Sequence, residues 1–172
     1  MSKNGNETRT DILDLQFINP FILGAVQALQ VQGGLKMEGG KPFLKGKQPQ
    51  PRFIVAGVLG LTSNKFRGAL TLWFEEAPFL KMLEFMLGEK IEAATSEYAD
   101  AAAEVLNITY GAAKTKLNET GYQLERALPT VLFGNDFTAR HSSLAPIIVI
   151  PLICEFGQVH IEISVDISVD PS

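Results

Sequence analysis

Residues 159–169 constrain the fold most, because their side chains alternate strictly in character. Every second residue from Val159 to Val169 is Val or Ile, and His, Glu, Ser and Asp occupy the positions between them. This period of two is typical of an antiparallel β-strand with one face on a core and the other in water. We therefore expect the face that carries His160 and Glu162 to be solvated. The apolar run 144–154 precedes this strand, and a turn at 155–158 predicts a hairpin.

Helical spacing and turn residues predict the rest of the fold. Asn19 and Pro20 resemble an N-cap and a first helical residue, so a helix should begin there and end at Gly33-Gly34. The other expected elements are a short strand at 35–38, a solvated loop at 39–52, a strand hairpin formed by 53–61 and 68–74, a helix at 76–87 closed by Gly88, a long helix from Thr95 or Ser96 to about Asn118, a strand at 122–127, an extended segment at 129–133 and a loop at 135–143.

This order of elements indicates an α+β fold with mixed α/β layers, in which helices pack on a largely antiparallel sheet. Residues 1–10 are polar and are expected to form a flexible tail, and 11–172 should form a single domain. No repeat at a fixed residue period is visible in the sequence.

Composition excludes several classes of function. Nineteen acidic residues against fifteen basic ones give a net charge of -4, which makes nucleic acid an unsuitable main partner. No apolar run approaches the roughly 20 residues that span a bilayer, and the N-terminus has no apolar signal segment. The single cysteine, Cys154, lies in an apolar run and is expected to be a buried thiol. We therefore expect a cytoplasmic protein without membrane insertion.

The long helix carries a polar strip, formed by Asp100, Glu104, Asn107 and Gly111. With 3.6 residues per turn, the last three fall at about 40°, −20° and 20° from Asp100. Such a strip can be an ordinary solvated face, since acidic residues near a helix N-terminus favour the helix dipole. Asn107 and Gly111 are nevertheless unfavourable inside a helix, where Gly costs about 1 kcal/mol relative to Ala. A partner surface that approaches the strip closely would explain both residues.

The pattern Asp100-x3-Glu104-x2-Asn107, followed by Gly111 and by Pro129-Thr130-Val131 with Gly134, resembles the CheC/CheX/FliY phosphatases of bacterial and archaeal chemotaxis. Twenty-one residues separate Asn107 from Pro129, one fewer than the family pattern. The Asn19-Pro20-Phe21 segment fits the same family. A second Glu-x2-Asn pair is absent from the sequence, and one site per chain resembles CheX rather than CheC. The resemblance implies a CheC-like fold.

The resemblance also implies the activity and the partners. The family removes phosphate from the aspartyl phosphate of the response regulator CheY, so the partner is a phosphorylated CheY-type receiver domain. That partner is expected to bring Mg²⁺, and this chain is expected to bind no cofactor and no metal. Asn107 would position the attacking water and Glu104 would dock against a basic group of the partner, both as catalytic residues; Asp100 and Gly111 would be binding residues. Members of the CheX type form homodimers, which implies a dimer with two separate sites.

Two alternatives from other classes remain open at the level of sequence. The chain could be a non-catalytic binding or adaptor module on the same scaffold, because flagellar switch proteins share this fold without the phosphatase pair. It could also be an unrelated α+β ligand-binding domain, which a large apolar pocket would favour. Weaker candidate sites are a nucleophile at His141-Ser142-Ser143, a metal pair at His160 and Glu162, and a reactive Cys154; a loop, a solvated strand face and a buried thiol explain them more simply.

Overall fold

The computed structural model describes residues 14–46, 48–134 and 145–167. Strand β7 (Gly157–Asp166) lies inside a seven-stranded sheet, between β6 (Ile147–Cys154) and β4 (Arg67–Glu75). Strand β3 (Phe53–Thr62) pairs with β4, and β5 (Thr130–Phe133) pairs with β3. Every pairing among the described strands is antiparallel, which confirms the expected sheet and both hairpins.

From either edge of the sheet, the order of strands is a short edge position followed by the two strands of a hairpin. Strands β1 (Glu38–Gly39) and β2 (Phe43–Leu44) both pair with β6, so the order runs β1/β2, β6, β7, β4, β3, β5. Each half of the chain therefore supplies a helix, a short edge strand and a hairpin, and each edge strand pairs with the hairpin of the other half. The structure thus contains a repeated arrangement that no fixed period in the sequence reveals.

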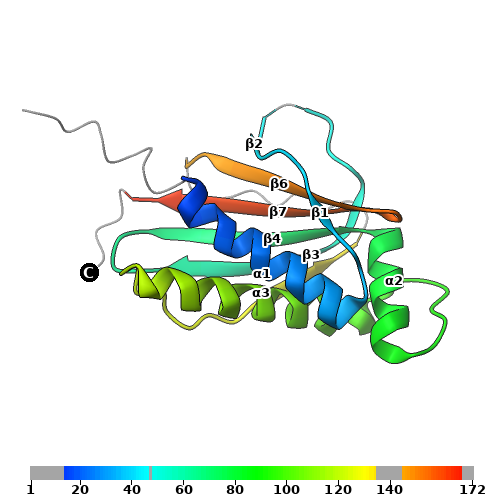
Figure 1. The fold of residues 1–172 in the computed structure, drawn as a ribbon. Coiled ribbons are helices and arrows are strands. Elements are labelled where there is room, and N and C mark those ends of the chain that lie inside the picture. Colours follow the sequence, from blue (N-terminus) through cyan, green and yellow to red (C-terminus); the bar gives the residue numbers. More distant parts are fainter. Residues whose placement is uncertain (1–13, 47, 135–144, 168–172) are drawn as a thin grey trace, which may run out of the picture.

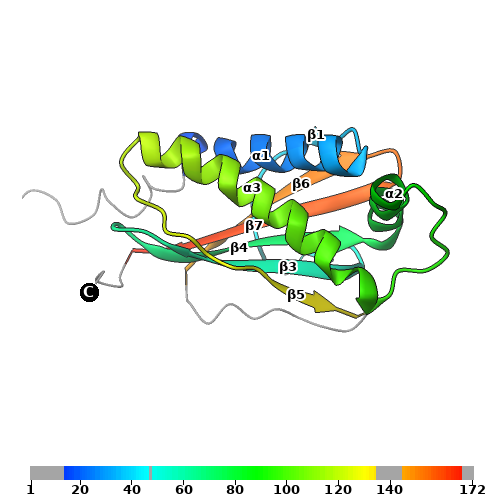
Figure 2. The same cartoon turned by 90° about the horizontal axis from the view of Figure 1, so that it is seen from below.

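Two helices cover one face of the sheet. Helix α1 (Leu15–Gly33) and helix α3 (Ala99–Glu119) lie side by side and antiparallel on that face, as Figures 1 and 2 show. Helix α2 (Glu76–Leu87) lies at the end of the sheet where β4 ends, and a short 3-10 helix, η1 (Ser96–Tyr98), leads into α3 (Figure 2). The buried faces of α1 and α3 form the core together with the inner face of the sheet. The helix predicted at 76–87 is confirmed, with Gly88 as its left-handed C-cap.

Helix α1 begins five residues earlier than the sequence predicts, at Leu15 instead of Pro20. Asp14 is the N-cap, and its side chain accepts a hydrogen bond of 2.8 Å from the backbone N–H of Phe17. Pro20 lies inside the helix, where it removes one backbone hydrogen bond. Burial of Phe17 and Ile18, which are 0% and 3% exposed, stabilises the first turn and outweighs this loss. The predicted end at Gly33-Gly34 is confirmed, because Gly34 adopts a left-handed conformation.

Two segments differ from their expected structure. The loop predicted at 39–52 contains β2, and the strand predicted at 35–38 is the shorter β1, which starts at Glu38. Residues 122–127 form no strand, because the backbone turns at Gln123 (φ 50°) and the Asn118 side chain bonds both backbone groups of Leu124. The extended segment predicted at 129–133 is confirmed as β5.

The polar face of β7 is buried, so its expected solvation is wrong. His160, Glu162 and Ser164 are 2%, 1% and 3% exposed. The Lys45 Nζ lies 2.7 Å from the Glu162 Oε1, and His160 packs edge-on against the ring of Phe53 at 4.9 Å. Polar side chains can be buried in this way when partners satisfy them, which an alternation pattern cannot reveal.

Candidate functional site

The polar strip lies on the outer side of α3. Asp100, Glu104, Asn107 and Gly111 are all exposed. The opposite side of the helix faces the core, and its buried residues are Ala102, Val105, Leu106, Thr109, Tyr110, Ala113 and Leu117. The helical register predicted from the sequence is therefore correct, and the helix presents its carboxylates and its amide outward along one line.

Two glycines position α3 against its neighbours. A Cβ at Gly57 of β3 would lie 3.1 Å from the Leu106 Cδ2, so α3 sits directly on the strand. A Cβ at Gly24 of α1 would lie 2.8 Å from the Thr109 carbonyl oxygen, so the two helices meet almost backbone to backbone. Sequence reasoning assigned neither glycine to the site, although a Gly inside a strand often marks a close backbone approach. Together they fix the direction in which the polar strip points.

The loop that follows α3 is tied to the helix by Tyr110. Its hydroxyl donates a hydrogen bond of 2.5 Å to the Glu125 carbonyl oxygen. Burial, and secondarily the charge of Glu125, raises the pKa of Tyr110 to about 12, so the phenol stays protonated as the donor. Strand β5, which carries Thr130 and Val131 of the motif, then pairs with β3 beside α3. The loop and β5 therefore hold α3 in place, and the polar strip on its exposed side has a fixed position.

Glu104 and Asn107 are available to a partner. Among residues 14–46, 48–134 and 145–167, no hydrogen bond or ion pair engages the side chains of Asp100, Glu104 or Asn107. Gly111 has open space around it, since an added Cβ would meet nothing within 4 Å. Within the described residues, nothing requires Gly at position 111.

Comparison with known families identifies the chain. The family model described as chemotaxis phosphatase CheX matches residues 55–152. The chain belongs to the CheX family. The CheX structure of Vibrio vulnificus is 30% identical, with a TM-score of 0.81, and the match covers 88% of this chain and 99% of that one. A CheC-like superfamily protein from Shewanella sp. PV-4 is 32% identical, with a TM-score of 0.82 and coverage of 90% and 99%.

More distant structures share the fold. The chain resembles the structure of a CheX–CheY complex with BeF3 and Mg²⁺ from Borrelia burgdorferi at 20% identity and a TM-score of 0.70, and the match covers 87% of this chain and 97% of that one. Curated protein sequences give no significant match. The chain is thus a chemotaxis phosphatase of the CheX family, and the CheC-like α+β fold that the sequence predicts is confirmed.

The other candidate sites do not assemble. His160 and Glu162 share a face of β7, but the His160 Nε2 lies 2.8 Å from the Gln158 Oε1 and Glu162 pairs with Lys45. Within the described residues, no group of three or more His, Cys, Asp or Glu side chains could hold a metal ion. Cys154 is only partly buried, contrary to expectation, because it ends β6 beside the turn to β7. The segment His141-Ser142-Ser143 lies outside the described residues.

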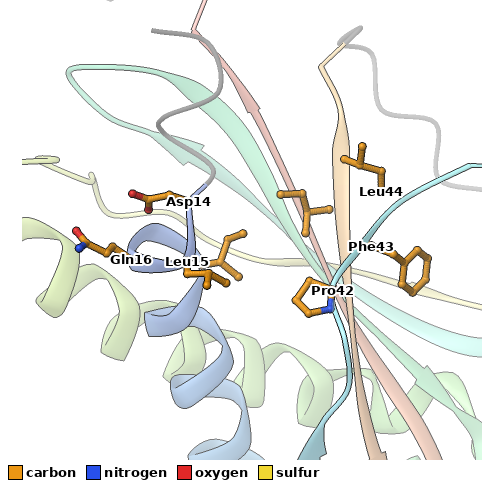
Figure 3. A pocket seen from close by; sticks show the side chains of 8 residues that line it. Asp14, Leu15, Gln16, Pro42, Phe43 and Leu44 are labelled. Atoms are coloured by element: carbon orange, nitrogen blue, oxygen red, sulfur yellow. The ribbon is translucent and has the colours of Figure 1, made fainter. Parts of the chain in front are cut away.

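A groove at the start of α1 offers little to a specific ligand. It measures about 640 Å³ and lies between the first turn of α1 and β2 (Figure 3). Leu15, Ile18, Phe43, Leu44 and Ile148 make most of its lining apolar. Of the lining residues that the structure describes, Asp14 is the single charged one, and it already caps α1. Ligand sites combine apolar walls with several convergent polar groups, which this groove lacks, so the ligand-binding alternative gains no support here.

The described helices give no indication of membrane insertion. None of them combines enough length with enough apolar character to cross a bilayer.

Proposed function

We propose that this chain hydrolyses the aspartyl phosphate of a CheY-type receiver domain, with Asn107 positioning the attacking water and Glu104 docking the partner. One observation carries the assignment: a carboxylate and a carboxamide, one turn apart and unpaired within the described residues, stand exposed on α3 of a CheX-family fold. The complex of CheX with CheY, BeF3 and Mg²⁺ from Borrelia burgdorferi supports the choice of partner.

Hydrolysis of an acyl phosphate by direct attack of water requires no covalent intermediate on this chain. Water attacks phosphorus in line, the bond between phosphorus and the carboxylate oxygen breaks, and the products are inorganic phosphate and the free aspartate. The receiver would bring Mg²⁺, which neutralises charge that develops on the phosphoryl oxygens. Positioning and electrostatics then supply most of the rate acceleration.

Asn107 suits the positioning role. The carboxamide Oδ1 can accept a hydrogen bond from the attacking water, while Nδ2 can donate one to a neighbouring oxygen. The amide also carries no charge that would repel the phosphoryl oxygens. Asn107 lies in the middle of α3, so the helix backbone fixes the position from which the amide reaches the water.

Glu104 suits the docking role, because its carboxylate can pair with a basic group beside the phosphorylation site of the receiver. Such a pair fixes orientation and register more than it adds affinity. Asp100 would contribute a further contact at the start of α3, and Gly111 would provide clearance. We also propose a cytoplasmic homodimer with two separate sites, as the family resemblance implies; light scattering on the purified protein measures the dimer.

The deciding experiment follows the loss of acyl phosphate from a purified, phosphorylated CheY-type receiver in the presence of Mg²⁺. Wild-type protein should accelerate the loss, and Asn107→Ala should slow it by about 100-fold or more towards the receiver's own rate, while binding survives. Glu104→Ala should raise KM as well. Asn64→Ala, at an exposed asparagine on the β3–β4 turn, is the matched control and should act like wild type.

Each other outcome has a distinct meaning. If Asn107→Ala retains the wild-type rate, the protein is still a phosphatase, but the role assigned to Asn107 is wrong. If wild-type protein binds the receiver without accelerating the loss, the chain acts as an adaptor towards that receiver.

A further inference from the structure

Helix α1 has an exposed face without charge. Residues 15–33 contain no Asp, Glu, Lys, Arg or His. Leu23 and Val31 are nevertheless 68% and 62% exposed on its outer side. A surface helix normally carries charged residues on its solvent face, and large exposed apolar side chains that cluster usually mark a contact surface.

The part of this face around Leu23 forms one wall of a groove beside the polar strip, whereas Val31 lies outside the groove. The groove has a volume of about 720 Å³ and lies between α1 and the C-terminal half of α3. Leu23 and Gln27 line it from α1, and Ala112 and Thr115 line it from α3. Gly24 also lines it, at a point where an added Cβ would lie 2.8 Å from the Thr109 carbonyl oxygen, so close packing of the two helices fixes the floor of the groove.

The groove is close to neutral. Among the described residues, its only charged lining residues are Lys116 and Glu119, which lie at the C-terminal end of α3. The Lys116 Nζ is 3.5 Å from the Glu119 Oε2, so the two charges largely compensate each other. A charged segment would find no counter-charge along α1, whereas an aliphatic or aromatic segment would bury apolar surface against Leu23.

The groove is continuous with the strip. Ala112 directly follows Gly111, and Thr115 lies one turn further along the same helix. A standard protein–protein interface uses about 20–30 residues on each side, whereas the polar strip supplies four. A receiver that places its phosphorylated aspartate over Asn107 must therefore also cover surface beside α3, and the groove provides that surface on the α1 side.

We propose that the groove between α1 and α3 receives an uncharged, aliphatic or aromatic surface segment of the receiver domain and thereby sets the affinity for that receiver. This inference rests on the proposed function, because the strip orients the partner. Leu23 is the main contact, and it acts on binding and not on chemistry. The fixed floor means that the groove is already formed before the receiver arrives, which lowers the cost of binding.

The test compares two exposed leucines. Leu23→Gln replaces the groove leucine with an uncharged residue, and Leu44→Gln makes the same change on β2, where the leucine is 63% exposed. Binding is measured with CheY-type receivers of the source organism that are activated by beryllium fluoride, which mimics a phosphoryl group, and Mg²⁺. Turnover is measured with the phosphorylated receivers. Leu23→Gln should raise both Kd and KM about ten-fold and leave kcat within about two-fold of wild type. Leu44→Gln should change none of them.

The outcomes separate this inference from the proposed function. Wild-type turnover with an unchanged Kd in Leu23→Gln overturns the groove assignment and leaves the phosphatase intact. If the wild-type protein binds the receiver without turnover, the proposed phosphatase activity is wrong. The Kd of Leu23→Gln then still shows whether the receiver binds in the groove. Absence of both binding and turnover in the wild type overturns both. If Leu23→Gln converts a dimer into a monomer in light scattering, the groove belongs to a second copy of this chain and the inference fails.

Discussion

His160 is a buried titratable residue that the proposed chemistry does not use. Burial is the main cause that lowers its pKa from the ordinary value of 6.5; the Lys45 charge lowers it further, and Glu162 opposes the shift. The folded protein therefore prefers the neutral imidazole, whereas the unfolded chain binds a proton below about pH 6.5. The resulting contribution to stability is complete above pH 6.5 and is lost as the pH falls through 6.5 towards the lower pKa of the folded state.

We therefore expect the free energy of unfolding to decrease between pH 7.5 and 5.5, and His160→Gln to flatten this dependence. Urea unfolding at a series of pH values measures the effect. The chain has one other histidine, His141, and the slope of His141→Gln measures how much of the pH dependence that residue supplies. An equal slope in wild type and His160→Gln would assign the pH dependence to other groups.

The residues of the polar strip could be predicted because helical spacing depends only on local geometry. Asp100, Glu104, Asn107 and Gly111 fall on one side of α3 as expected. The burial of His160 and Glu162 could not be predicted, since it depends on Lys45 and Phe53, which are distant in the chain. A period of two shows that two faces differ in polarity, but it does not show whether polar partners cover the polar one.

At the scale of elements, two interior helix glycines serve opposite purposes. Gly24 of α1 is required by packing, because an added Cβ would lie 2.8 Å from the Thr109 carbonyl oxygen. Gly111 of α3 has free space, and Ala is intrinsically better than Gly in a helix by about 1 kcal/mol. The same substitution should therefore have opposite effects at the two positions.

We expect Gly111→Ala to raise the free energy of unfolding by up to about 1 kcal/mol and Gly24→Ala to lower it by about 1–3 kcal/mol. Thermal and urea unfolding of the two variants measure the difference. Gly111→Leu, which adds bulk beside Asn107, should also raise KM for the phosphorylated receiver while keeping the fold. A fall in stability in Gly111→Ala would show that position 111 is constrained from within the chain.

The boundaries of elements were predictable where local signals dominate. Gly34 and Gly88 end their helices as expected, because a left-handed residue is a local requirement. The start of α1 was not predictable from Asn19 and Pro20, since tertiary burial of Phe17 decides it. The groove between α1 and α3 likewise depends on how the two helices pack, so nothing in the sequence of either helix alone indicates it.

At the scale of the molecule, the two halves of the chain are interleaved. Strand β4 pairs with β7 from Arg67 to Phe74, and each edge strand completes the sheet of the other half. Neither half can keep its sheet when the other unfolds. The structure should therefore unfold as one cooperative unit.

Fluorescence of the single tryptophan, Trp73, tests whether unfolding is cooperative. Trp73 is 5% exposed on β4 and lies opposite His160 of β7, so its fluorescence reports on the junction between the halves. The urea midpoint from Trp73 fluorescence should coincide with the midpoint from far-ultraviolet circular dichroism, which reports on all helices. Separate midpoints would show that the helical layer and the junction unfold independently.

The interleaved sheet also affects how the protein is made. Strand β4 is complete at residue 75, but its neighbour β7 ends only at residue 166, which is 91 residues later. At about 5–20 residues per second, a ribosome needs roughly 5–18 s to supply the missing strand. During this interval β3 and β4 form a hairpin with open edges, and open edges are the part of a sheet that pairs with foreign chains. In the growing polypeptide, the edge of β4 that β7 covers in the folded protein therefore stays open to pairing with other chains until β7 has been synthesised.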